Sequence, residues 1–181
     1  MAIEVLEFTR EDKAKLGRGA RFYSLDGSSQ AAIINQRNQA GLVGFRYNWI
    51  EGKLCENEPG GVVGEVAIFP HKPIISGSFY KDDAEQLKLV RRYSNELGLT
   101  YAQAIIGTIA TLDAVLFAHA DATGEWLLPW EAVRSSTVVE EPYLADVGFS
   151  EPGSGFLVNG AHRDNHDGIL GALCLVVPKN K

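Results

Sequence analysis

The chain has 181 residues, of which 45% are hydrophobic and 9% aromatic, and its formal net charge is -6 at pH 7. This length and apolar content suffice for a sizeable core, so we expect a single globular domain over residues 1–181. The acidic balance excludes a general attraction to nucleic-acid phosphates or anionic lipid, and two cysteines are too few for a disulfide scaffold.

The N-terminal stretch "MAIEVLEFTREDK" contains acidic side chains and no apolar run of the kind found in secretory signals. We therefore expect a soluble, cytoplasmic protein. Residues 3–8 alternate weakly between apolar and polar types, which predicts a short strand. Residues 9–17 predict a short helix, because Thr9 can cap its start and Gly17 can end it.

A β-rich region is predicted between residues 20 and 80. Runs of β-branched and aromatic residues are separated there by turn compositions such as "DGSS" and "PHKP". We expect four or five antiparallel strands. The candidate runs are "ARFYSL" (20–25), "AAIIN" (31–35), "GLVGFRYNWI" (41–50), "GVVGEVAIF" (61–69) and "IISGSFY" (74–80).

Two consecutive helices are predicted next, at about residues 82–97 and 101–120. The first is amphipathic, with Asp82 or Asp83 as its cap and Gly98 as its end. The second follows a possible cap at Thr100 and is apolar nearly all round, which indicates a buried helix.

The second predicted helix is also long enough to raise the question of a membrane span. Asp113 lies near its centre, and an aspartate at that depth costs about 3 kcal/mol in lipid. We therefore expect no membrane association. From Gly124 onward the chain returns to short strands and turns, so the order of elements predicts an α+β fold. In it, the two helices cover one face of a mostly antiparallel sheet of several short strands.

A cluster of metal-ligand types stands out in "HRDNHDG". His162, Asp164, His166 and Asp167 are suitable donors for one transition-metal ion, and alternate residues of an extended segment point to the same side. The same residues also lie between the turn pairs Asn-Gly and Asp-Gly, which is typical of a solvated hairpin tip. The sequence leaves both interpretations open and favours the hairpin tip.

Motifs for other chemistry are missing. The sequence has no G-x-S-x-G nucleophile elbow, no P-loop and no G-x-G-x-x-G dinucleotide fingerprint. We therefore predict no catalytic residues and no cofactor, apart from the metal ion that the histidine cluster would bind.

Residues 74–118 resemble a ribbon-helix-helix DNA-binding unit. The resemblance rests on "IISGSFY", the helix "DDAEQLKLVRRYSNELG" and the turn texture of "NELGLTYAQAI". It implies paired strands from two chains in the major groove of DNA. The expected strand has no arginine or lysine to contact guanine, which argues against nucleic acid as the partner.

The tryptophans suggest how the protein makes contacts. Trp126 and Trp130 lie in a region rich in turn signals, and Trp49 ends an aromatic strand, so all three are candidates for a subunit interface. We therefore expect a non-catalytic structural or interaction protein, part of a homo-oligomer or bound to a protein partner. The alternatives are a small metal-dependent enzyme using the His162, Asp164 and His166 loop, and a ribbon-helix-helix-like DNA-binding protein.

Overall fold

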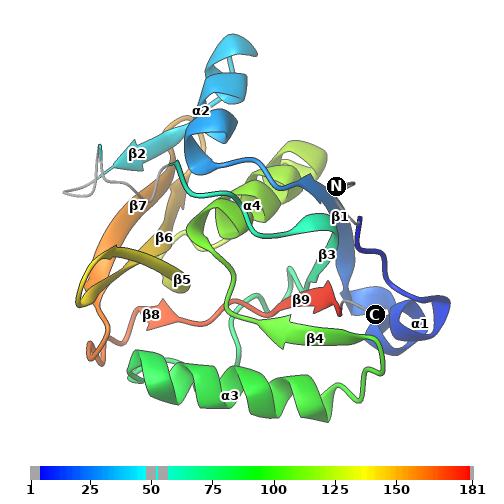
Figure 1. Cartoon of the computed structure of the whole chain (residues 1–181). Coiled ribbons are helices and arrows are strands. Elements are labelled where there is room, and N and C mark those ends of the chain that lie inside the picture. Colours follow the sequence, from blue (N-terminus) through cyan, green and yellow to red (C-terminus); the bar gives the residue numbers. More distant parts are fainter. Residues whose placement is uncertain (1–4, 48–51, 53–56, 180–181) are drawn as a thin grey trace.

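Two β-sheets and four α-helices make up the protein (Figure 1), which the computed structural model describes at residues 5–47, 52 and 57–179. The helices are α1 (Arg10–Leu16), α2 (Gln30–Gln39), α3 (Asp83–Glu96) and α4 (Ile109–Thr123), and a 3-10 turn covers Gly17–Gly19. The strands are β1 (Arg21–Asp26), β2 (Phe45–Tyr47), β3 (Val63–Ile68), β4 (Ala102–Ile105), β5 (Ala132–Glu140), β6 (Tyr143–Glu151), β7 (Gly155–His162), β8 (Leu170–Gly171) and β9 (Leu175–Pro178).

The strands form a four-stranded and a five-stranded sheet. The first has the order β1-β3-β9-β4, and all of its neighbours are antiparallel. The second has the order β2-β7-β6-β5-β8, with an antiparallel centre and short parallel strands at both edges. The C-terminal strand β9 lies in the middle of the first sheet, so both ends of the described chain contribute to one sheet.

The alternation of side chains along β9 shows how the layers are stacked. Leu175 and Val177 belong to the core cluster that contains α4, whereas Cys174 and Val176 belong to the cluster that contains Val90 of α3. Adjacent residues of a strand point to opposite faces of the sheet. Helix α4 therefore lies between the two sheets, and α3 packs on the outer face of the four-stranded sheet (Figure 1).

The expected α+β class and mostly antiparallel strands are confirmed, but the second predicted helix starts too early. Residues 102–105 form the edge strand β4, in which buried side chains alternate with more exposed ones, and α4 begins at Ile109. Thr108 caps it by accepting a hydrogen bond from the amide of Thr111. The two helices also lie on opposite faces of the four-stranded sheet rather than on one face, since they pack against alternate residues of β9.

Two predicted strands between residues 20 and 80 are wrong. Residues 31–35 lie within α2, which Ser29 caps through the amide of Ala32. Residues 74–80 form turns and make one isolated bridge, between Ile74 and Leu173. The ribbon strand and the start of the second helix, on which the resemblance to ribbon-helix-helix proteins rested, are therefore not formed.

Other local predictions are confirmed. Thr9 accepts a hydrogen bond from the amide of Asp12 at the start of α1, and Gly17 ends this helix with φ of 69°. Helix α3 matches the predicted amphipathic helix to within one residue at each end. Among the described residues, no helix is both long and apolar enough to cross a lipid bilayer.

The aspartate in the middle of α4 pairs with a residue of α2. Gln30 Nε2 donates to Asp113 Oδ2 over 2.5 Å, and both side chains are fully buried. Burial raises the pKa of Asp113 well above its ordinary value, and the hydrogen bond from Gln30 opposes this only in part. Asp113 Oδ1 and Gln30 Oε1 are both buried without a hydrogen-bond partner among the described residues. A neutral carboxyl is less costly to bury in this way than an ionised one.

We expect Asp113 to make folding sensitive to pH. Because its pKa is higher in the folded state than the unfolded value of 3.8, the folded state holds a proton that the unfolded state has lost, so stability falls as pH rises above about 4. An Asp113→Asn variant should lose this part of the pH dependence. Urea unfolding of both proteins between about pH 4 and pH 8 measures the difference. Parallel stability curves for the two proteins would contradict the assignment.

Candidate functional site

The structure does not gather the four predicted metal ligands at one point. His162 ends β7, and its Nδ1 lies 3.9 Å from Asp164 Oδ2, whose side chain is 80% exposed. His166 points toward α3, with Nδ1 3.3 Å from the carbonyl of Tyr80. Asp167 Oδ1 accepts a hydrogen bond from the amide of Ile169, as in an aspartate turn. This arrangement agrees better with a polar loop than with a four-ligand metal site.

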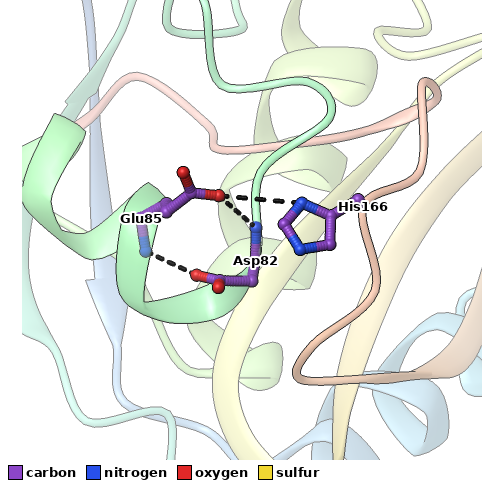
Figure 2. Close-up of side chains that lie close together, drawn as sticks. All are labelled: Asp82, Glu85 and His166. Atoms are coloured by element: carbon purple, nitrogen blue, oxygen red, sulfur yellow. Dashed lines mark hydrogen bonds and ion pairs between the residues drawn. The ribbon is translucent and has the colours of Figure 1, made fainter.

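One of the four, His166, does meet carboxylates from another segment (Figure 2). Ligand atoms of Asp82, Glu85 and His166 all lie within 4.8 Å of one another, the one such group of three or more found within the described ranges. Glu85 Oε2 is 3.7 Å from His166 Nδ1. Asp82 and Glu85 come from the start of α3, where the sequence predicted Asp82 or Asp83 as a helix cap and gave Glu85 no role.

Helix capping accounts for these two carboxylates without a metal ion. Asp82 Oδ1 accepts from the amide of Glu85 over 2.7 Å, and Glu85 Oε2 accepts from the amide of Asp82 over 3.2 Å, which is a complete capping box. The backbone bond from Asp82 lowers the pKa of Glu85, and Lys81 adds to this effect. The positive end of the α3 dipole also disfavours a bound cation. We interpret the cluster as a helix cap to which the His166 loop is tethered.

Removing the cap should lower the free energy of unfolding. It should not change how that free energy responds to added zinc or to chelator. We expect Asp82→Ala to lower the free energy of unfolding by about 0.5 to 2 kcal/mol, because the amide of Glu85 loses its acceptor. The neighbouring Asp83→Ala variant is the matched control and should lose less, about 0.3 to 1 kcal/mol from the helix dipole alone. Urea unfolding with added zinc and with chelator measures both. A zinc-dependent gain that disappears in Asp82→Ala would show a metal site instead.

A second group of polar residues crosses the centre of the five-stranded sheet. Arg134 on β5 lies opposite Asp146 on β6, and Asp146 lies opposite Asn159 on β7. The flanking residues Val133 and Val147 belong to the core cluster around α4. Because strand residues alternate, the polar row lies on the sheet face that points away from α4.

Arg134 is the anchor of this row. Its side chain is buried, with 1% exposed, and its three donor nitrogens bond Gln86 Oε1 and the carbonyls of His162 and Asn165, over 3.1 to 3.2 Å. Gln86 in turn donates to the carbonyls of Ser78 and Leu170. Arg134 therefore fastens the 162–165 loop and α3 to the sheet. Burial lowers the pKa of its guanidinium, although nearby aspartates oppose this.

Asp146 occupies the middle of the row and lines a cavity of about 190 Å³. Only 4% of its surface is exposed, and burial raises its pKa to about 7, with Arg134 opposing the shift and Asp167 adding to it. The side-chain oxygen of Asn159 beside it is buried without a hydrogen-bond partner in the described part of the chain. His162 and Asp167, two of the four predicted metal ligands, also line this cavity.

A larger cavity, of about 360 Å³, lies between α3 and residues 69–76, and Cys174 lines it. Cys174 Sγ donates to the hydroxyl of Tyr93 over 2.9 Å. Burial raises the pKa of the thiol to about 11, so it stays protonated at neutral pH and is a poor nucleophile. Cys174 is therefore not an activated nucleophile in this cavity.

The tryptophan candidates fall into three situations. Trp126 is half-buried and packs on Phe117 and Phe156, with ring centroids 6.2 and 5.2 Å away, so it fills the edge of the core. Trp130 is 78% exposed. Trp49 lies outside the described residues. Of the three, Trp130 is the residue that the described structure presents on the surface.

Comparisons of this chain with known protein families, with curated proteins and with solved structures found no match.

Proposed function

We propose that this protein is a non-catalytic interaction protein that acts as a subunit of an oligomer or larger assembly, and that it makes contact through the surface around Trp130. The observation that carries the proposal is the 78% exposure of that tryptophan. Burying an indole ring removes a large apolar area from water, which is why tryptophan is enriched among residues that dominate binding energy.

The backbone places other exposed apolar side chains along the same edge. The amide of Ala132 donates to the carbonyl of Ile169, and the amide of Tyr80 donates to the carbonyl of Asp167. Ile169 and Tyr80 are also exposed, by 44% and 69%. We call Trp130, Ile169 and Tyr80 the Trp130 surface. It lies beside the two-residue edge strand β8, so a partner can approach it without displacing a long strand.

The test is the mass of the protein in solution. We expect multi-angle light scattering to find an oligomer whose dissociation constant rises about tenfold or more in a Trp130→Ala variant. Leu42→Ala is the matched control, because Leu42 is an exposed apolar residue just beyond α2. A wild-type protein that stays monomeric at all concentrations, or an oligomer unaffected by Trp130→Ala, would contradict the proposal.

A metal-dependent enzyme is the second candidate function, and the cluster of Asp82, Glu85 and His166 favours it. Its weakness is that the capping box already uses both carboxylates. One metal ion per chain in the purified protein, lost in His166→Ala, would support the enzyme over the interaction protein.

A further inference from the structure

We propose that the cavity in front of Asp146 binds an organic cation, a primary ammonium group on a short alkyl chain, with the carboxylates of Asp146 and Asp167 and the side-chain oxygen of Asn159 as acceptors. This proposal does not depend on the Trp130 surface. The ammonium group can belong to a free small amine or to a lysine side chain of a partner protein, since both offer the same chemistry.

The Asp146 carboxylate has no hydrogen-bond donor among the described residues. The three hydrogen bonds that its cross-strand neighbour Arg134 donates go to Gln86 and to the carbonyls of His162 and Asn165, not to Asp146. In the described part of the chain, no hydrogen bond reaches the Asp146 carboxylate, although 96% of the residue's surface is buried. A buried carboxylate without donors is costly, so a ligand that supplies donors gains affinity there.

The sign of the charge comes from the residues that line the cavity. Asp146 and Asp167 contribute carboxylates and Asn159 contributes an unpartnered oxygen, whereas the described lining includes no lysine or arginine. His162 is the one other titratable side chain among them. An anion would meet two carboxylates, so the cavity is suited to a cation that donates hydrogen bonds.

The shape of the cavity favours an organic cation over a bare metal ion. The donor atoms of Asp146, Asp167 and His162 do not come within 4.8 Å of one another as a group, in contrast to those of Asp82, Glu85 and His166. Part of the remaining wall is apolar, and an alkyl chain can lie against it while the ammonium group reaches the carboxylates. The apolar side chains of the lining are those of Ala132, Phe149, Ala161, Ile169 and Leu170.

Binding should also respond to pH. The cation favours ionised Asp146, whose pKa of about 7 in the free protein is raised by burial, so binding at pH 6 releases a proton and is weaker than at pH 8. The charged and titratable groups that face Asp146 are Arg134 from β5, His162 from β7 and Asp167 from the loop before β8. Arg134 stays charged throughout this range.

Titration calorimetry with n-butylammonium and with N-acetyl-lysine methylamide tests the proposal, with magnesium and calcium ions as competing probes. We expect wild-type protein to bind n-butylammonium, and Asp146→Asn to weaken binding about tenfold or more through loss of a charged acceptor. Asp164→Asn is the matched control, because this carboxylate is in the same loop as Asp167, does not line the cavity and is 80% exposed. The asparagine side chain of Asp146→Asn has nearly the same shape as a protonated aspartate. A melting temperature equal to that of the wild type will show that the variant folds.

The outcomes separate the possible ligands. Binding of both amines would assign the cavity to ammonium groups, including lysine side chains, and binding of n-butylammonium alone would assign it to free small amines. No amine binding, equal binding by Asp146→Asn, or binding of metal ions alone would overturn the proposal. Trp130→Ala should bind the amine as wild type does, so this proposal and the interaction proposal can fail separately.

Discussion

Arg134→Ala should lower the free energy of unfolding by about 3 to 5 kcal/mol. The substitution leaves Gln86 Oε1 and the carbonyls of His162 and Asn165 without their donor, in a region where Arg134 itself is 1% exposed. Each buried acceptor that loses its partner costs about 1 to 3 kcal/mol, and the cavity left by the side chain adds to this.

Two further variants distinguish the hydrogen-bond network from charge alone. Arg134→Lys keeps the charge, but its single ammonium nitrogen cannot reach the three acceptors that the planar guanidinium bonds. We therefore expect it to recover only part of the lost stability. Arg163→Ala removes a partly exposed ion pair with Glu141 and should cost less than about 1 kcal/mol. Urea unfolding measures all three. A loss below about 1 kcal/mol for Arg134→Ala would show that the loop is held by other contacts.

The loop anchored by Arg134 also explains what the sequence could and could not predict about the candidate site. The turn at residues 162–168 could be predicted from the sequence, because aspartate and glycine favour turns through their own backbone conformation and local hydrogen bonds. Asp146 was missed, since its importance comes from lying opposite Arg134 and Asn159 on other strands. An aspartate within the otherwise apolar run of β6 was the one available signal.

Helix starts show the same division between local and distant causes. The start of α3 was predictable because Asp82 and Glu85 form a capping box within four residues. Thr100 and Thr108 are both suitable caps ahead of apolar residues, and the choice between them depends on residues 102–105 pairing with β9 far along the chain. Only the second threonine caps α4.

The error over α2 has a different physical origin. The pair Ile33 and Ile34 favours a strand by its side chains, yet Ser29 supplies a local cap and α2 packs against α4. Arg37 reinforces that packing through hydrogen bonds of 2.7 and 3.0 Å to the carboxylate of Asp121. Tertiary contacts of this kind override the intrinsic preference of a short segment.

Phe156→Ala should also cost about 3 to 5 kcal/mol, because this side chain is fully buried where α4 meets the five-stranded sheet. Its ring centroid lies 5.1 Å from that of Phe117 and 5.2 Å from that of Trp126, so truncation leaves a cavity bordered by two aromatic rings. Phe156→Leu keeps most of the volume and is the matched control, with an expected cost of about 1 kcal/mol.

The form of the Phe156→Ala transition tests whether residues 1–181 unfold as one domain. Side chains of both sheets, such as Val66 and Val147, belong to one core cluster with Leu116 of α4. If α4 couples the sheets, the variant should unfold in a single transition at lower urea, and amide exchange should accelerate in both sheets. Exchange that accelerates only in the five-stranded sheet would mean that the sheets are separate cooperative units, because the lost contacts would then destabilise one side of α4 alone.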